Sequence, residues 1–123
     1  MSENRQFVEE KKRILKEGFL NGFDLYRAMT AGINNLLPYQ DKLDEINVFP
    51  VPDGDTGTNM VFTLTSILDS TKKMVHPRAD EMLVLIADAA LDGARGNSGV
   101  ILAQFFQGLS DGAAGVEKLT PEN

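Results

Sequence analysis

Residues 47–60 read NVFPVPDGDTGTNM, and this stretch places two aspartates on either side of a glycine, ahead of a helix-patterned segment. Two prolines restrict the approach, because proline fixes its own φ and disfavours helix at the preceding residue. Gly54 and Gly57 permit backbone conformations that other residues avoid, so N–H groups can approach a ligand closely. Carboxylate oxygens suit Mg²⁺. The stretch therefore predicts a loop that holds a metal ion and a polyphosphate, with Asp53 and Asp55 as the acidic ligands.

The same residue types are also common in ordinary surface turns, and that alternative stays open for the stretch taken alone. Spacing excludes several familiar sites. An EF-hand loop requires a carboxylate at its twelfth position, where Leu64 stands. A Walker loop requires a lysine beside its closing glycine, and neither Gly57 nor Gly99 has one. The dinucleotide-binding motif requires G-x-G-x-x-G after a strand, whereas the later glycines are spaced by threes in a helical context.

A second glycine-rich stretch, residues 92–100, reads DGARGNSGV and lies between two helix-patterned segments. Gly93 or Gly96 is suited to end the incoming helix in a left-handed conformation, and Asn97 or Ser98 is suited to cap the outgoing one. A helix that begins here would aim several N–H groups and its positive end at one point, where a phosphate can bind. A tight helix-to-helix connection, with its arginine as a solvated charge, explains the same residues, and both alternatives stay open.

Together the two stretches resemble the ATP-binding domain, or L domain, of the dihydroxyacetone kinase family. The resemblance is closest to the branch that includes the ATP-binding subunit of bacterial fatty acid kinase and proteins joined to a DegV-type lipid-binding partner. The signature strings of that branch are N-V-[FY]-P-V-P-D-G-D-T-G-T-N-M and A-R-G-N-S-G-V-I-L, and both stand here almost unchanged. Residues 21–22 and 31–36 also look like its first helix, so the resemblance runs from about Leu20 to Gly108.

The resemblance implies roles for individual residues. Asp53 and Asp55 correspond to the catalytic aspartates that bridge Mg²⁺ to the nucleotide phosphates. The dihydroxyacetone branch has a third metal carboxylate five residues before the first of these, where Val48 stands here, so Asn47 is the candidate replacement through its amide oxygen. The implied nucleotide-contacting residues are Thr56, Gly57, Thr58, Asn59, Gly96, Asn97 and Ser98.

The implied activity is Mg²⁺-dependent transfer of the γ-phosphate of ATP to an acceptor that another domain or subunit presents. In the leading interpretation, the acceptor is a fatty acid carboxylate on a DegV-type fatty-acid-binding protein, and the product is an acyl phosphate. One alternative acceptor is a small hydroxyketone, as in dihydroxyacetone (glycerone) kinases. The other alternative is a catalytically silent helical module that associates with partners through an open face. No acceptor pocket is recognisable in the sequence.

Composition favours a cytoplasmic domain. The chain has 123 residues, a formal net charge of −6 and no run close to the ~20 apolar residues that a membrane span requires. An acidic chain without a basic stripe is a poor candidate for binding nucleic acid or an anionic membrane surface. The absence of cysteine excludes disulfides and thiolate metal sites. Charged residues 9–13 stand where a signal peptide would have its apolar core, so export is not expected.

Apolar residues recur at helical spacing along the chain, and no convincing alternation predicts a strand, so the predicted fold is all-α. Asn21 is suited to cap a helix that Pro38 ends. Further helices are expected at residues 58–74, 79–94 and 100–109.

By resemblance, the complete domain is an antiparallel, barrel-like bundle of about eight helices, and this chain supplies its first half. We expect residues 1–19 to form a charged N-terminal helix or arm, 20–109 the N-terminal half of the L domain, and 110–123 a flexible tail. The helices of such a half-bundle present apolar faces, which a homo-oligomer or a second chain would have to cover.

Overall fold

The computed structural model describes residues 2–46 and 54–122 of the chain. These residues form helices and no named strand, which confirms the all-α prediction; an isolated bridge pairs Leu20 with Leu119. The elements in chain order are α1 (Ser2–Glu17), α2 (Gly22–Leu36), the 3₁₀ turn η1 (Leu37–Tyr39), α3 (Gln40–Glu45), α4 (Thr56–Thr71), α5 (Ala79–Gly93) and α6 (Gly96–Gly112).

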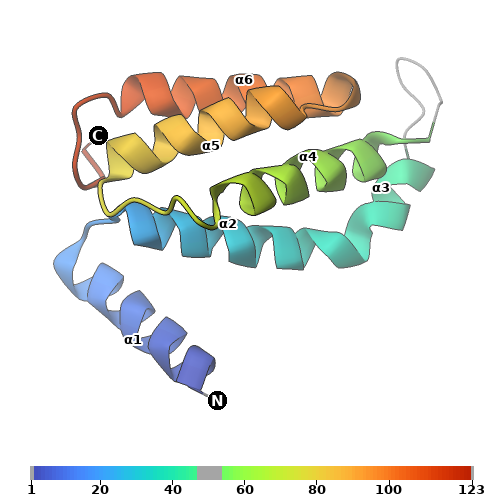
Figure 1. Cartoon of the computed structure of the whole chain (residues 1–123). Coiled ribbons are helices and arrows are strands. Elements are labelled where there is room, and N and C mark those ends of the chain that lie inside the picture. The colour runs from blue at the N-terminus through green and yellow to red at the C-terminus, as the bar shows by residue number, and fades with distance from the viewer. Residues whose placement is uncertain (1, 47–53, 123) are drawn as a thin grey trace.

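Helices α2, α4, α5 and α6 pack side by side as a partial bundle, and α1 projects away from one end of it (Figure 1). Ile67, Met82 and Ile86 are buried at the centre of this group. Small side chains surround them and allow the helices to approach closely. The buried alanines are Ala79, Ala87, Ala89, Ala90, Ala103 and Ala113.

The start of α2 is fixed by the cap that the sequence predicts. Asn21 accepts a hydrogen bond from the backbone N–H of Asp24 at 3.0 Å, and the Asp24 carboxylate accepts one from the backbone N–H of Asn21 at 2.8 Å. The buried Asp24 carboxylate also pairs with Arg13 of α1 and lies 3.6 Å from a guanidinium nitrogen of Arg27. This capping box therefore also ties α1 to the bundle.

Helix boundaries differ from the predicted ones where partners distant in sequence decide them. The helix α4 starts at Thr56, two residues before the predicted start, and α6 starts at Gly96 instead of Val100. The short elements η1 and α3 were not predicted, since six residues carry too little periodic pattern to identify a helix.

The segment after α6 folds back onto the starts of α2 and α5. Leu119 and Leu20 exchange backbone hydrogen bonds of 2.8 Å in both directions. The backbone N–H of Ala79 donates to the carbonyl of Glu117 at 2.7 Å, and that of Asp80 donates to the carbonyl of Val116 at 3.0 Å. These carbonyls satisfy first-turn donors of α5, which have no partner within their own helix. The domain boundaries at residues 19 and 109 stay predictions.

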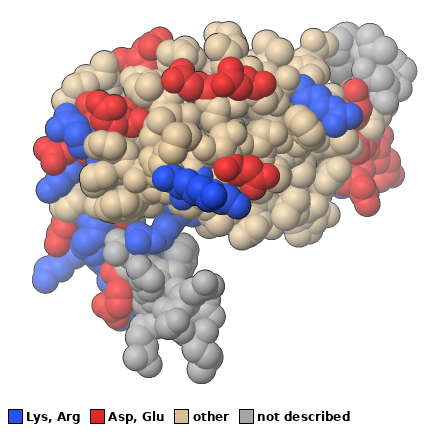
Figure 2. Space-filling view, in the orientation of Figure 1, with Lys and Arg blue, Asp and Glu red and all other residues tan. Residues whose placement is uncertain are grey.

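None of the helices in residues 2–46 and 54–122 combines the length and apolar character needed to cross a membrane. On the face shown in Figure 2, Lys and Arg side chains lie in small separate groups near Asp and Glu side chains.

A chain that ends at Gly112 is expected to be less stable than the full chain by about 2 kcal/mol or more. It loses the backbone hydrogen bonds of residues 116–119, and each such bond contributes roughly 1 kcal/mol. Urea unfolding followed by circular dichroism measures the difference. A chain that ends at Thr120 keeps these bonds and serves as the control. Equal urea midpoints for the two shortened chains would contradict a stabilising role for the hydrogen bonds of residues 116–119.

Candidate functional site

The starts of α4 and α6 lie at the same end of the bundle, and residues of the two glycine-rich stretches touch there (Figure 1). The hydroxyl of Ser98 donates to the backbone carbonyl of Thr56 at 3.3 Å. The backbone of Gly96 packs against the side-chain amide of Asn59. The described parts of both stretches therefore form one continuous surface, although they are about forty residues apart in sequence.

Glycine is required on the α6 side of this contact. Gly96 has a φ of +69°, and a Cβ there would overlap the buried Asn59 side chain. The next contact along the helix pair is made by Thr63, which is fully buried and donates from its hydroxyl to the carbonyl of Asn59 at 2.8 Å. The same hydroxyl oxygen accepts a 3.1 Å hydrogen bond from the backbone N–H of Arg95. Thr63 therefore joins the entry to α6 directly to α4.

The predicted capping roles at this junction were wrong. Arg95, and not Asn97 or Ser98, occupies the N-cap position of α6, and it makes no side-chain capping hydrogen bond. The Ser98 hydroxyl is directed to the α4 carbonyl instead. Of the two glycines expected to end α5, Gly96 alone is left-handed, and it is the first residue of α6.

Asp44 of α3 caps the start of α4, and sequence reasoning missed it. Its carboxylate accepts a 2.9 Å hydrogen bond from the backbone N–H of Thr58 and a 2.6 Å hydrogen bond from the Thr58 hydroxyl. The hydroxyl hydrogen bond, followed by the backbone one, lowers the pKa of Asp44 below its ordinary value. A carboxylate at this position also interacts favourably with the positive end of the helix.

Helix α3 thus holds the α4 start from one side. The side-chain amide of Gln40 donates to the Thr58 hydroxyl at 3.3 Å, and the carbonyl of Gln40 lies where a Cβ on the buried Gly57 would have to be. Because Asp44 takes both the backbone N–H and the hydroxyl of Thr58, these two groups contact a phosphate only if Asp44 moves. All the predicted nucleotide-contacting roles stay predictions, those of Thr56, Gly57, Thr58, Asn59, Gly96, Asn97 and Ser98.

Asp55 stands immediately before α4, at its N-cap position. Its side chain makes no capping hydrogen bond to the helix, while its carbonyl accepts one from the backbone N–H of Asn59 at 2.9 Å. Gly54 before it has a φ of +67°, a conformation that favours glycine. The other predicted metal ligands, Asn47 and Asp53, lie outside the described residues. Within residues 2–46 and 54–122, no group of three or more His, Cys, Asp or Glu side chains is placed to hold a metal ion.

Arg95 brings a positive charge to the same end of the bundle. Its guanidinium carbon lies 4.8 Å from the centre of the Phe62 ring on α4, a cation–π contact between exposed side chains. From the sequence, this arginine was expected only to be a solvated charge, because nothing in the local pattern places it over an α4 side chain.

A family model, the DAK2 domain, matches residues 50–123, which include this junction and the segment after α6. The chain belongs to the DAK2 domain family. Membership confirms the resemblance to the dihydroxyacetone kinase family and identifies the chain as a module of a kinase-type family. The fatty acid kinase branch stays a prediction.

Curated relatives of this DAK2 domain chain include uncharacterized staphylococcal proteins. One from Staphylococcus saprophyticus is 47% identical over 79 residues, which cover 64% of this chain and 14% of the relative. One from Staphylococcus epidermidis is 39% identical over 101 residues, or 82% of this chain and 18% of the relative. One from Staphylococcus aureus is 43% identical over 90 residues, which cover 73% of this chain and 16% of the relative. The matched part thus spans less than one-fifth of the length of each of these relatives.

Replacing Asp44 by alanine is expected to lower the midpoint of thermal unfolding, because the N–H and hydroxyl of Thr58 lose their acceptor. Asp44→Asn should lower it less, since an amide oxygen can still accept from the backbone N–H. Asp41→Ala, an exposed aspartate on the same helix, is the matched control and should change the midpoint little.

The stabilisation of the fold by Asp44 should be present at neutral pH and lost in acid. A carboxyl group whose pKa is lowered on folding stabilises the fold above its unfolded pKa of about 3.9, and this contribution disappears as the pH falls through the lower folded pKa. The difference in midpoint between the unmodified chain and Asp44→Asn should therefore be constant near neutral pH and shrink below about pH 4. A difference in midpoint that grows as the pH falls would contradict the role of the Asp44 carboxylate as the cap of α4.

Proposed function

We propose that this chain is the Mg²⁺-ATP-binding part of a kinase that transfers the γ-phosphate of ATP to an acceptor presented by a partner. The observation that supports this proposal best is the hydrogen bond between Ser98 and Thr56, because it joins the starts of two helices at one place. Helix starts favour anions through their positive dipole ends and through first-turn N–H groups that have no partner within the helix. At the α4 start, a phosphate would have to displace Asp44 from the N–H of Thr58. Two such ends beside an aspartate suit a polyphosphate that carries a metal ion.

The residues present fit Mg²⁺ and a nucleotide. Asp55, together with Asp53 and Asn47, would supply the hard oxygen ligands that Mg²⁺ prefers. A metal ion held by these residues would neutralise part of the negative charge that develops on the transferring phosphoryl group. Residues 56–59 and 96–98 would orient the phosphates through backbone N–H groups and short polar side chains. Arg95, held over Phe62, would add a positive charge close to them.

In the proposed reaction, an acceptor oxygen attacks the γ-phosphorus and the bond to the ADP oxygen breaks, so ADP leaves with the electron pair. We propose a fatty acid carboxylate on a DegV-type carrier as the acceptor, which yields an acyl phosphate in the cytoplasm. Support for this branch comes from residues 49–52, FPVP. Membership of the DAK2 domain family supports a kinase-type function and does not distinguish between the acceptors. A hydroxyketone acceptor, as in dihydroxyacetone kinases, is the alternative within the same chemistry.

An exposed apolar row on α6 favours association with another chain. Ile101, Phe105 and Leu109 recur every four residues and are 68%, 60% and 43% exposed. A second copy or another polypeptide would bury this row and complete the bundle. The same row is the observation that favours the second candidate function, a helical interaction module without catalysis.

Calorimetric titration tests nucleotide binding by the full chain. ATP is expected to bind with Mg²⁺ and much more weakly without it, and Asp55→Asn or Asp53→Asn should weaken Mg²⁺-ATP binding about tenfold or more, equivalent to about 1.4 kcal/mol. Asp69→Asn removes an exposed carboxylate elsewhere on α4 and should leave the affinity unchanged.

A folded chain that does not bind Mg²⁺-ATP would reject the kinase proposal, as would equal affinities for the Asp55→Asn and Asp69→Asn variants. The acceptor is identified by phosphate transfer from radiolabelled ATP in two reactions, one with a fatty-acid-loaded DegV-type carrier and one with dihydroxyacetone. Radiolabel on the fatty acid would support the acyl phosphate branch. Radiolabel on dihydroxyacetone would reject that branch and support the dihydroxyacetone kinase alternative.

A further inference from the structure

The start of α4 is capped by a carboxylate from a different helix. A cap ordinarily comes from the residue just before the helix, but the side chain of Asp55 at that position makes no capping hydrogen bond. Asp44 of α3 takes this role, because its carboxylate accepts from the backbone N–H of Thr58 at 2.9 Å and from the Thr58 hydroxyl at 2.6 Å. The cap can therefore leave the α4 start without unwinding the first turn of α4.

Neutral donors hold the Asp44 carboxylate. Its pKa is lowered by the hydroxyl and backbone hydrogen bonds of Thr58, with a smaller contribution from the backbone of Gly57. No Lys or Arg side chain in residues 2–46 and 54–122 forms an ion pair with it. Backbone N–H groups and a hydroxyl at a helix start are also the donors that bind a phosphate oxygen. Asp44 thus occupies the position that a phosphate at the α4 start would take.

Other contacts keep α3 against α4 when the carboxylate leaves Thr58. The side-chain amide of Gln40 donates to the Thr58 hydroxyl at 3.3 Å. The backbone of Gly57 packs so closely on α3 that a Cβ there would overlap the Gln40 carbonyl and lie 2.9 Å from the Cβ of Leu43. None of these contacts involves the Asp44 carboxylate, and Asp44 is partly exposed. Rotation of its side chain toward solvent therefore releases the donors and preserves the α3–α4 packing.

We propose that Asp44 is an affinity-determining residue of the nucleotide site, whose carboxylate competes with a phosphate group of the nucleotide for the donors of Thr58. This inference rests on the proposed Mg²⁺-ATP-binding function. In the free chain, the carboxylate holds the N–H and hydroxyl of Thr58. When Mg²⁺-ATP binds, a phosphate oxygen replaces the carboxylate and the Asp44 side chain turns to solvent. The same contact that stabilises the free fold therefore lowers the affinity for the nucleotide.

Calorimetric titration of the full chain with Mg²⁺-ATP tests this competition. Asp44→Asn should tighten binding about fivefold, because a neutral amide oxygen competes less well than a carboxylate for the same donors. Asp44→Ala leaves no acceptor and should tighten binding at least as much. Asn keeps an acceptor for the Thr58 N–H, so Asp44→Asn supplies the test if the alanine variant does not fold. A residue that only stabilised the fold would leave the affinity unchanged or lower it when replaced.

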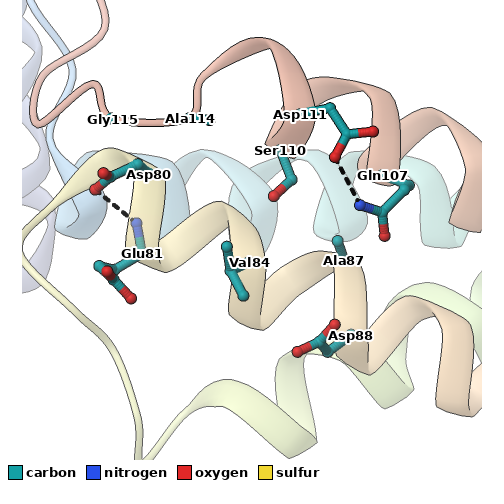
Figure 3. Close-up of a pocket in the computed structure, with 10 residues that line it drawn as sticks. All are labelled: Asp80, Glu81, Val84, Ala87, Asp88, Gln107, Ser110, Asp111, Ala114 and Gly115. Carbon is teal, nitrogen blue, oxygen red and sulfur yellow. Dashed lines mark hydrogen bonds between the residues drawn. The ribbon is translucent and has the colours of Figure 1, made fainter.

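Two variants control for the loss of one negative charge. Asp41→Asn removes an exposed carboxylate from the same helix. Glu81→Gln removes an exposed carboxylate that lines a groove between α5 and α6, at the start of α5 and the opposite end of the bundle from the α4 start (Figures 1 and 3). Each control should change the affinity by less than about twofold, because salt screens exposed charges that do not touch the ligand.

Amide NMR of the unmodified chain gives a second readout, in which Mg²⁺-ATP should shift the signals of Asp44 and Thr58 together. A shift at Thr58 without one at Asp44 would overturn the inference. So would equal or weaker binding by Asp44→Asn than by Asp41→Asn; both results would leave the kinase proposal intact. The absence of Mg²⁺-ATP binding by all of these chains would reject the kinase proposal and this inference together.

Discussion

The close contact between α4 and α6 is the constraint on which the candidate site depends. Thr63 is buried between them, and its hydroxyl serves both helices by donating to the carbonyl of Asn59 and accepting from the N–H of Arg95. Gly96 and Gly99 let the α6 backbone approach α4, since a Cβ at either position would overlap an α4 side chain. Without this approach, the start of α6 would move away from Thr56, and the two glycine-rich stretches would no longer share a surface.

Charged groups from several elements lie at this end of the bundle. Asp44 of α3 takes up donors at the α4 start, Asp55 stands just before that helix, and Arg95 lies over Phe62. A phosphate at the α4 start would compete with the Asp44 carboxylate for the N–H and hydroxyl of Thr58. The arrangement therefore couples the position of α3 to anything that binds at the start of α4.

Local signals in the sequence predicted the features that depend on neighbouring residues. Asn21 and Asp24 are three residues apart, so the cap of α2 could be predicted from neighbouring residues. Helical periodicity was sufficient to predict the all-α fold. Features that depend on distant residues were missed. Asp44 reaches Thr58 across fourteen residues of sequence, and no spacing rule connects them. Ser98 has the right chemistry for a helix cap, but the carbonyl of Thr56, forty-two residues away, takes its hydroxyl.

The most direct measurement is an amide NMR titration of the full chain with Mg²⁺-ATP. If both stretches contact the same triphosphate, the amide signals of residues 55–59 and 95–98 should shift together and saturate with a single dissociation constant. Shifts confined to one of the two stretches, or two clearly different dissociation constants, would contradict a shared nucleotide site.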